Sequence, residues 1–255
     1  MENSCVGVVI REQLQGENDK LLTILTPEGK IFAYAKGVKK ISSKNAPACQ
    51  LFVFSEFELL QKSGRTVVKT AISKELFYNM RSDMTKYALA CYFAEVINHI
   101  TTENNDESET LRLFLNTLYA LANKDDIPLW QIKGAFELKL MSICGFMPDF
   151  TTCFGCGCDI ELSKNNVFSF EEAALICDKC RNGNVAYSCT LTGDVCNAMK
   201  FIANSSVTSF LSFKIDDSLS YEFSFVCENY LIHKTERTYE TLKIYKSILN
   251  SLGEK

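Results

Sequence analysis

Five cysteines within 28 residues are the part of this sequence best suited to chemistry. They occur in CFGCGC and CDKC, at Cys153, Cys156, Cys158, Cys177 and Cys180. Two C-x2-C pairs are separated by 20 residues, a spacing typical of a zinc site built from two knuckles. Four thiolates around one ion leave no open position for water or substrate. The pattern therefore predicts one structural zinc ion per chain, held by Cys153, Cys156, Cys177 and Cys180.

Other interpretations of these thiols fit the sequence less well. A thioredoxin-like redox pair needs a βαβ context, which neither pair has. Zinc hydrolysis or deamination needs a general base beside the metal, and the two histidines, His99 and His233, form no H-x-E signature. Clustering without a metal is a third alternative. We interpret Cys158 as a cysteine that does not bind the metal. The alternative is that it replaces Cys156 as a ligand.

No other motif in the sequence indicates catalysis. It contains no G-x4-G-K-[ST] phosphate loop, no G-x-G-x-x-G after a strand and no G-x-S-x-G elbow. A histidine-based triad is disfavoured because both histidines lie in predicted helices, and we expect His99 on the solvent side of its helix. The sequence therefore predicts a protein that is not an enzyme.

The charge distribution indicates a basic module at one end of an acidic chain. The net charge is −4, yet residues 1–81 carry 12 Lys and Arg against 8 Asp and Glu. No acidic residue occurs between Glu28 and Glu56. Lysines clustered on a loop suit a phosphate backbone, because neutralising phosphates releases condensed counterions. The loop segment AKGVKKISSK therefore predicts nucleic-acid binding, with a merely solvated loop as the alternative.

Further residues extend this candidate surface. Positive charges around the SGR turn join it if both loops lie on one side of the domain. Phe32 and Tyr34 can stack on bases or belong to the core, whereas Phe52 and Phe54 are expected in the core. The predicted DNA-binding residues are Lys36, Lys39, Lys40, Lys44, Lys62, Arg65, Lys69 and Tyr34.

The first 75 or so residues read as short strands that position this loop. Segments such as CVGVVIRE, KLLTILT and KIFAYAK are rich in β-branched and aromatic residues and end at turn signals. Five such strands fit a small Greek-key barrel, of which the OB architecture is one example. From about residue 82 the apolar period becomes helical. Ser82 is a plausible N-cap, a second helix starts near Asp106, and a third opens at Pro128.

The sequence also indicates the cellular compartment in which we expect the protein. No export signal is visible at MENSCVGVVIREQ, and no apolar run approaches the roughly 18 residues that cross a bilayer. Twelve cysteines in such a chain point to a reducing cytoplasm.

The chain as a whole resembles the bacterial DNA repair and recombination mediator family RecO. The resemblance rests on GVVIREQLQGENDKLLTILTPEGKIFAYAKGVKKISSK, on GAFELKLMSICGFMPDFTTCFGC with FSFEEAALICDKC, and on ERTYETLKIYKSIL. This sequence departs from the family at EEAAL, where members of the family commonly have glycines. The resemblance implies an OB barrel, a helical domain and a zinc-binding insertion. It also implies that the AKGVKK loop is part of the DNA surface and that the four cysteines are zinc ligands.

These observations lead to one overall prediction. The fold is α+β, with a five-stranded OB-type barrel at 1–80, an all-α domain from 81–150 and 185–255, and a zinc knuckle inserted at 151–184. By resemblance, the protein binds and anneals single- and double-stranded DNA, acts with RecR and single-stranded-DNA-binding protein, and helps load RecA. We expect it in the cytoplasm, near the nucleoid, without a membrane partner. The alternative is a zinc-containing adaptor that binds only proteins.

Overall fold

The computed structural model describes residues 2–162, 164–181 and 187–253. Contacts divide the chain into two compact units. The first comprises Met1–Asp125 together with Tyr239–Lys255, and the second comprises Asp126–Thr238. The chain therefore leaves the first unit, builds the second, and returns.

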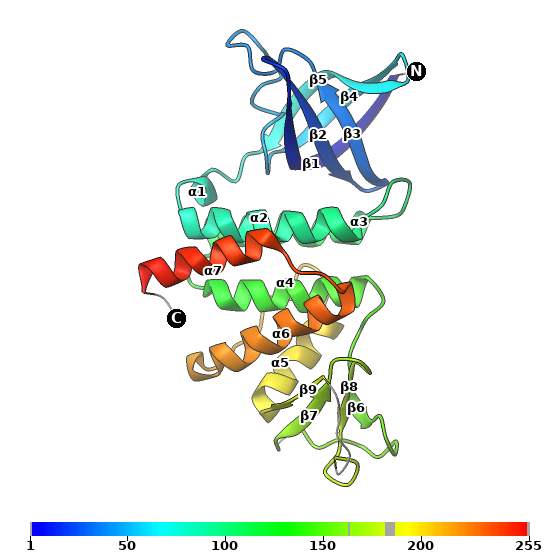
Figure 1. Ribbon diagram of the computed structural model, residues 1–255, viewed down its shortest axis with the longest axis vertical. Coiled ribbons are helices and arrows are strands. Elements are labelled where there is room, and N and C mark those ends of the chain that lie inside the picture. Colours follow the sequence, from blue (N-terminus) through cyan, green and yellow to red (C-terminus); the bar gives the residue numbers. More distant parts are fainter. Residues whose placement is uncertain (1, 163, 182–186, 254–255) are drawn as a thin grey trace. The chain divides into compact units, whose positions relative to one another are not determined.

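A closed five-stranded barrel begins the first unit (Figure 1). Its strands are β1 (Glu2–Gln15), β2 (Asp19–Thr26), β3 (Gly29–Ala35), β4 (Phe54–Lys62) and β5 (Arg65–Glu75). They are arranged in the order β1-β2-β3-β5-β4. All pairs are antiparallel except β3 with β5, which are parallel and meet at Tyr34 and Val67. The predicted fold class, a barrel of this type followed by helices, is confirmed.

Alternating side chains fill the barrel. In KIFAYAK, Ala33 and Ala35 are buried, whereas Phe32 is exposed and Tyr34, which lies between the two alanines, is half-buried. Leu22 and Ile24 on β2 join the two alanines in one apolar cluster. This alternation is the period-2 pattern of a strand with one face on the core. The sequence left open whether Phe32 belongs to the core, and the structure places it on the outer face of the barrel.

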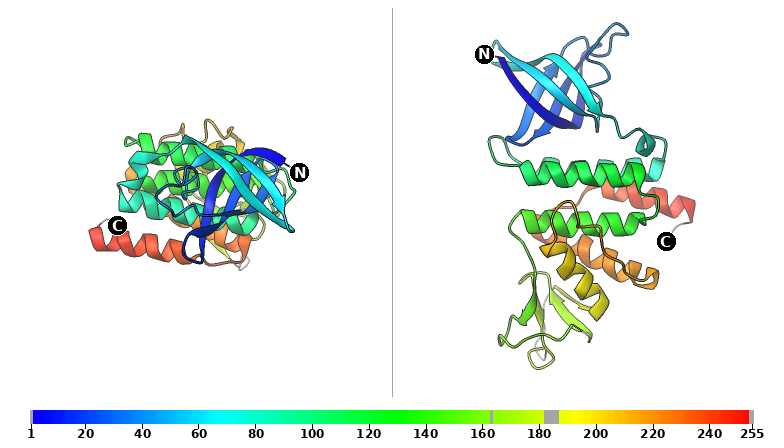
Figure 2. Two further views of the ribbon diagram at one scale, coloured as in Figure 1. Left: turned by 90° about the horizontal axis from the view of Figure 1, so that it is seen from above. Right: turned by 180° about the vertical axis from the view of Figure 1, so that it is seen from behind.

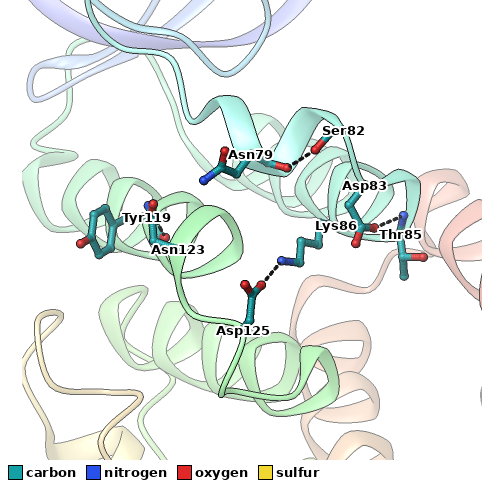
Figure 3. A network of polar contacts seen from close by, with 8 residues as sticks. All are labelled: Asn79, Ser82, Asp83, Thr85, Lys86, Tyr119, Asn123 and Asp125. Atoms are coloured by element: carbon teal, nitrogen blue, oxygen red, sulfur yellow. Dashed lines mark hydrogen bonds and ion pairs between the residues drawn. The ribbon is translucent and has the colours of Figure 1, made fainter.

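Four helices complete the first unit. They are α1 (Tyr78–Arg81), α2 (Met84–Ile100), α3 (Ser108–Asn123) and α7 (Glu240–Leu252). The N-cap of α2 is Asp83, whose carboxylate accepts the N–H group of Thr85 (Figure 3) and also that of Lys86. The expectation that Ser82 caps this helix is wrong, because its hydroxyl donates to the Asn79 carbonyl instead.

An ion pair ties the start of α2 to the end of α3. The Lys86 ammonium lies 2.6 Å from the Asp125 carboxylate, as Figure 3 shows. The opposite end of α3 begins at Ser108, whose N–H donates to the Asp106 carboxylate. Both ends of α3 are thus fixed by charged side chains that lie outside the helix.

Phe52 joins the barrel to the helices. Its ring meets those of Tyr87 and Phe114 edge-on, with centroids 5.4 and 6.3 Å away. Its N–H donates to the Val9 carbonyl. Its φ of 64° is unusual for a bulky residue, so surrounding packing must hold this conformation. Phe52 is fully buried, as expected from the sequence.

Helix α7 returns to the first unit and lies along α2 (Figures 1 and 2). The Thr241 N–H donates to the Glu95 carboxylate at 3.0 Å. The Tyr239 hydroxyl lies 3.2 Å from His99 Nδ1. The expectation that His99 faces solvent is therefore wrong, because the ring of Tyr239, the residue before α7, packs against it and His99 is half-buried.

The second unit combines helices with a small sheet. Its elements are α4 (Leu129–Ile143), β6 (Asp149–Cys153), β7 (Asn166–Ser169), β8 (Ala174–Ile176), β9 (Ser188–Leu191), α5 (Gly193–Asn204), the 3-10 turn η1 (Asp217–Leu219) and α6 (Ser220–Thr235). The strands form a sheet in the order β6-β8-β7-β9. In the described ranges, no helix is both long and apolar enough to span a bilayer.

Helices α4 and α6 share a buried ionic group. The Lys133 ammonium lies 2.8 Å from the carboxylates of both Glu137 and Glu228. Burial lowers the pKa of Lys133, but the two carboxylates outweigh it and raise the pKa above its ordinary value. Beside it, Gly134 has no room for a side chain, since an added Cβ would lie 2.4 Å from the Phe223 ring. A charge buried in this way is retained only while its partners remain.

The Phe52 contact yields a stability prediction. Substituting Phe52→Ala should lower the free energy of unfolding by about 3–5 kcal/mol, because it leaves a cavity between the barrel and two helices. The matched control is Phe32→Ala, which removes an exposed ring and should change stability by no more than about 0.5 kcal/mol. Denaturant unfolding measures both, and equal effects would contradict the role given to Phe52.

Candidate nucleic-acid interface and metal site

The connection between β3 and β4, residues 36–53, is called the lysine loop here. The two strands are not neighbours in the barrel, because β5 lies between them. The loop therefore crosses from one to the other over the end of the barrel. Val38, Ala48 and Cys49 are buried in the barrel's apolar cluster. The loop thus has an inner apolar side that closes the barrel and an outer side that faces solvent.

Backbone contacts fix the start of this loop. The Gly37 N–H donates to the Asp19 carboxylate at 2.7 Å, and the Lys39 N–H donates to the Asn18 carbonyl at 3.0 Å. Gly37 has a φ of 61°, a left-handed conformation that costs glycine little. The lysine loop is therefore attached to the β1–β2 hairpin where the chain leaves β3.

Asn45 fixes the middle of the loop. Its side-chain amide donates to the Lys69 carbonyl at 3.2 Å and accepts the Ala71 N–H at 3.1 Å. One side chain thus satisfies two backbone groups on one edge of β5. Together with the buried side of the loop, this contact gives the exposed lysines a pre-organised base.

Four of the predicted DNA-binding lysines project from the outer side of this loop. Lys36, Lys39, Lys40 and Lys44 are all exposed. Within the part of the chain that the structure describes, none of the four has a carboxylate within 4.0 Å. Glu17 from the β1–β2 hairpin nevertheless lines a shallow open pocket with Lys36 and Lys40. The sequence alone could not show that Glu17 lies near these lysines, because Glu17 belongs to a different connection between strands.

The remaining predicted residues lie elsewhere on the barrel. Lys62 and Arg65 are at the β4–β5 hairpin, which leaves the barrel at a different place from the lysine loop (Figures 1 and 2). The Arg65 guanidinium lies over the Tyr34 ring, 5.2 Å from its centroid. Lys69 lies 3.7 Å from the Glu58 carboxylate. The structure thus brings Tyr34 and Arg65 together, and it places Lys69 beside an acid.

Lys30 lies before the lysine loop, in the same stretch without acidic residues between Glu28 and Glu56, and it has a structural contact. Its ammonium donates to the Asn98 carbonyl at 2.8 Å, and its N–H donates to the Thr102 carbonyl at 2.9 Å. A cation at the C-terminus of α2 interacts favourably with the helix dipole. Lys30 therefore holds the β2–β3 hairpin against α2, and sequence reasoning could not separate it from the exposed lysines.

Two neighbouring strands position the four predicted metal ligands. Strands β6 and β8 are parallel, β6 ends at Cys153, and Cys177 directly follows β8. The Sγ atoms of Cys153, Cys156, Cys177 and Cys180 all lie within 4.8 Å of one another. With Zn–S distances of about 2.3 Å, the sulfurs of a tetrahedral site are about 3.8 Å apart. The Cys156–Cys177 sulfur distance of 3.7 Å fits that value, so these thiols can hold a metal ion.

Backbone N–H groups favour a thiolate at Cys153. Burial raises the pKa of Cys153, but N–H groups including that of Cys177, 3.3 Å from the sulfur, lower it to about 6. Gly155 allows the two knuckles to approach, because an added Cβ would lie 3.0 Å from Cys180 Sγ. Cys158 is exposed and is not one of the four clustered residues. Four cysteine sulfurs suit a metal ion that accepts sulfur ligands in tetrahedral coordination. They leave no coordination position open.

Comparison with known proteins covers both units. The family described as Recombination protein O N terminal matches residues 1–74, and Recombination protein O C terminal matches residues 81–243. The chain belongs to the RecO family. A relative named DNA repair protein RecO from Acetivibrio thermocellus is 31% identical over 95% of both chains. One of the same name from Alkaliphilus metalliredigens is 31% identical over 95% of this chain and 98% of its own.

Membership of the RecO family places the chain among proteins named for DNA repair and recombination. The RecO N-terminal match covers β1 to β4 and nearly all of β5. The C-terminal match contains all four clustered cysteines. The sequence-based identification of the family is therefore confirmed.

The thiol cluster predicts how this RecO-family chain responds to loss of one ligand. Cys177→Ser should lower the zinc content from about one ion per chain and lower the melting temperature, because metal binding contributes folding free energy. Cys158→Ser is the matched control and should keep both. Elemental analysis and thermal unfolding give the two readouts. Full zinc occupancy in Cys177→Ser, or its loss in Cys158→Ser, would contradict this assignment.

Proposed function

We propose that this protein is a non-catalytic, DNA-binding recombination mediator. It binds and anneals DNA strands and, with RecR, helps load RecA onto single strands coated by single-stranded-DNA-binding protein. Membership of the RecO family supports a role in repair and recombination. The observation that carries DNA binding is the group of exposed lysines on the anchored lysine loop.

Electrostatics explains how these lysines act. Lys36, Lys39, Lys40 and Lys44 extend into solvent from a loop whose inner side is buried in the barrel. Each ammonium that meets a phosphate releases a condensed counterion, which gives affinity without sequence preference. Neutralised strands repel one another less, so a second strand can approach and pair.

The β4–β5 hairpin offers a separate contact. Lys62 and Arg65 lie there, and Tyr34 under the Arg65 guanidinium provides an aromatic surface. Base–aromatic stacking is tolerant of sequence. We assign this hairpin a second DNA segment rather than the one on the lysine loop. Lys69 contributes less, because Glu58 already lies beside its ammonium.

The other parts of the chain have supporting roles in this proposal. Residues 1–80 act as the DNA-binding segment, and the helical segments 81–150 and 185–255 bind RecR and single-stranded-DNA-binding protein. The segment 151–184 holds one structural zinc ion through its four clustered thiols. We place this activity in the cytoplasm, at the nucleoid, where gapped DNA is found.

Salt dependence tests the proposal. If four loop lysines each meet one phosphate, the slope of log K against log salt on single-stranded DNA is about −3, from roughly −0.7 per contact. Changing Lys36, Lys39, Lys40 and Lys44 together to Gln should remove this contribution of about −3 to the slope and leave only that of the β4–β5 hairpin. Fluorescence anisotropy with a labelled oligonucleotide at several salt concentrations measures it.

A charge-matched variant controls for net charge. Lys74, Lys164, Lys214 and Lys243 are also exposed but lie outside the lysine loop. Changing these four to Gln removes the same total charge and should leave the slope nearly unchanged. Equal losses in both variants would mean that overall charge, not the lysine loop, attracts DNA. An unchanged slope in the loop variant would favour the protein-binding adaptor.

A further inference from the structure

Ile41 occupies the tip of the lysine loop with its side chain in solvent. Its relative accessible surface is 107%, the highest value among the large apolar side chains of residues 2–162, 164–181 and 187–253. Single exposed apolar residues are common on protein surfaces. The position of this one is informative because of the turn that carries it and the charges that surround it.

A tight turn presents Ile41. The Ser43 N–H donates to the Lys40 carbonyl at 2.9 Å, which closes a four-residue turn with Ile41 in its second position. Turn positions favour Gly, Pro, Asn, Asp and Ser, each for a conformational reason that a β-branched residue does not share. Neither turn chemistry nor core packing therefore accounts for isoleucine here.

The base of the loop prevents this side chain from folding back. Val38 is buried in the barrel on one side of the turn, and Asn45 bonds to β5 on the other. The Lys40 N–H also donates to the Gly37 carbonyl, which closes an adjoining turn. The tip is thus held between two fixed points, and Ile41 projects from a pre-organised support.

Lysines flank Ile41 along the chain. Lys39 and Lys40 precede it, Lys44 follows it, and all three are exposed. A strand whose phosphates contact these ammonium groups brings its bases within reach of the apolar tip. Architectural DNA-binding proteins use isoleucine among other apolar residues as wedges between base steps. The cost is low on a single strand, where no pairing has to be broken.

We propose that Ile41 inserts between adjacent bases of the single strand that the lysine loop binds. This inference rests on the proposed DNA binding and deepens it, because the lysines contact phosphates whereas Ile41 contacts base faces. The lysine loop then distinguishes a strand with accessible bases from a polyanion of equal charge. The ligand class is single-stranded DNA, including the single-stranded part of a gapped duplex.

The test compares the wild-type chain with Ile41→Ser and Ile41→Leu. Each binds two oligonucleotides of equal length, one with normal bases and one with an abasic central segment. Ile41→Ser should weaken binding to the normal strand by about tenfold, as expected when one apolar side chain loses most of its burial. Its affinity for the abasic strand and its salt slope should stay unchanged, because its lysines remain. Ile41→Leu should retain wild-type binding.

A spectroscopic readout reports insertion directly. With 2-aminopurine flanked by adenines, wild type and Ile41→Leu should raise fluorescence by unstacking the probe, whereas Ile41→Ser should not. Thermal unfolding should be the same for all three, since Ile41 makes no buried contact. Equal affinities and equal fluorescence for wild type and Ile41→Ser would overturn the inference, as expected if Ile41 instead anchors a protein partner. Failure of the proposed function is distinct, because the wild-type chain would then bind neither oligonucleotide.

Discussion

Barrel closure is the constraint on which the candidate interface depends. Strand β5 pairs with β3 and separates it from β4, although β4 follows β3 in the sequence. The connecting chain must therefore cross the barrel end, and its inner side must replace water over the apolar interior. Val38, Ala48 and Cys49 meet that requirement. The lysines are consequently carried on a segment that the fold itself needs.

Strand direction has a comparable effect on the thiols. Because β6 and β8 are parallel, their carboxyl ends lie at one edge of the sheet, and each is followed by a knuckle. The apolar cluster beside them consists of Cys153, Val167 and Ile176, which is small for an independent core. The sheet brings the sulfurs together, and a bound ion would in turn hold the sheet edges. The position of the sulfurs and the stability of the small sheet would therefore depend on each other.

Local patterns in the sequence were sufficient for the barrel strands, the cysteine pairs and the most exposed lysines. Each depends on a short period or spacing, such as the alternation around Ala33 and Ala35. Contacts between distant residues were not predictable in this way. The Lys30 ammonium donates a hydrogen bond to the Asn98 carbonyl, and Glu17 lines a pocket with Lys36. No sequence pattern indicates either pairing. Strands β6 to β9 were missed because they are only three to five residues long, too short for a clear period.

Helix α7 has a consequence for how the protein is made. It contacts α2 in the first unit, yet it is synthesised only after every residue of the second unit. Until then, the surface of α2 around Glu95 and His99 lacks its cover while the ribosome extends the chain. The barrel can fold early, but the first unit is complete only after α7 has been synthesised. A nascent chain stalled before Tyr239 would thus lack the contacts that Tyr239 and Thr241 make with α2.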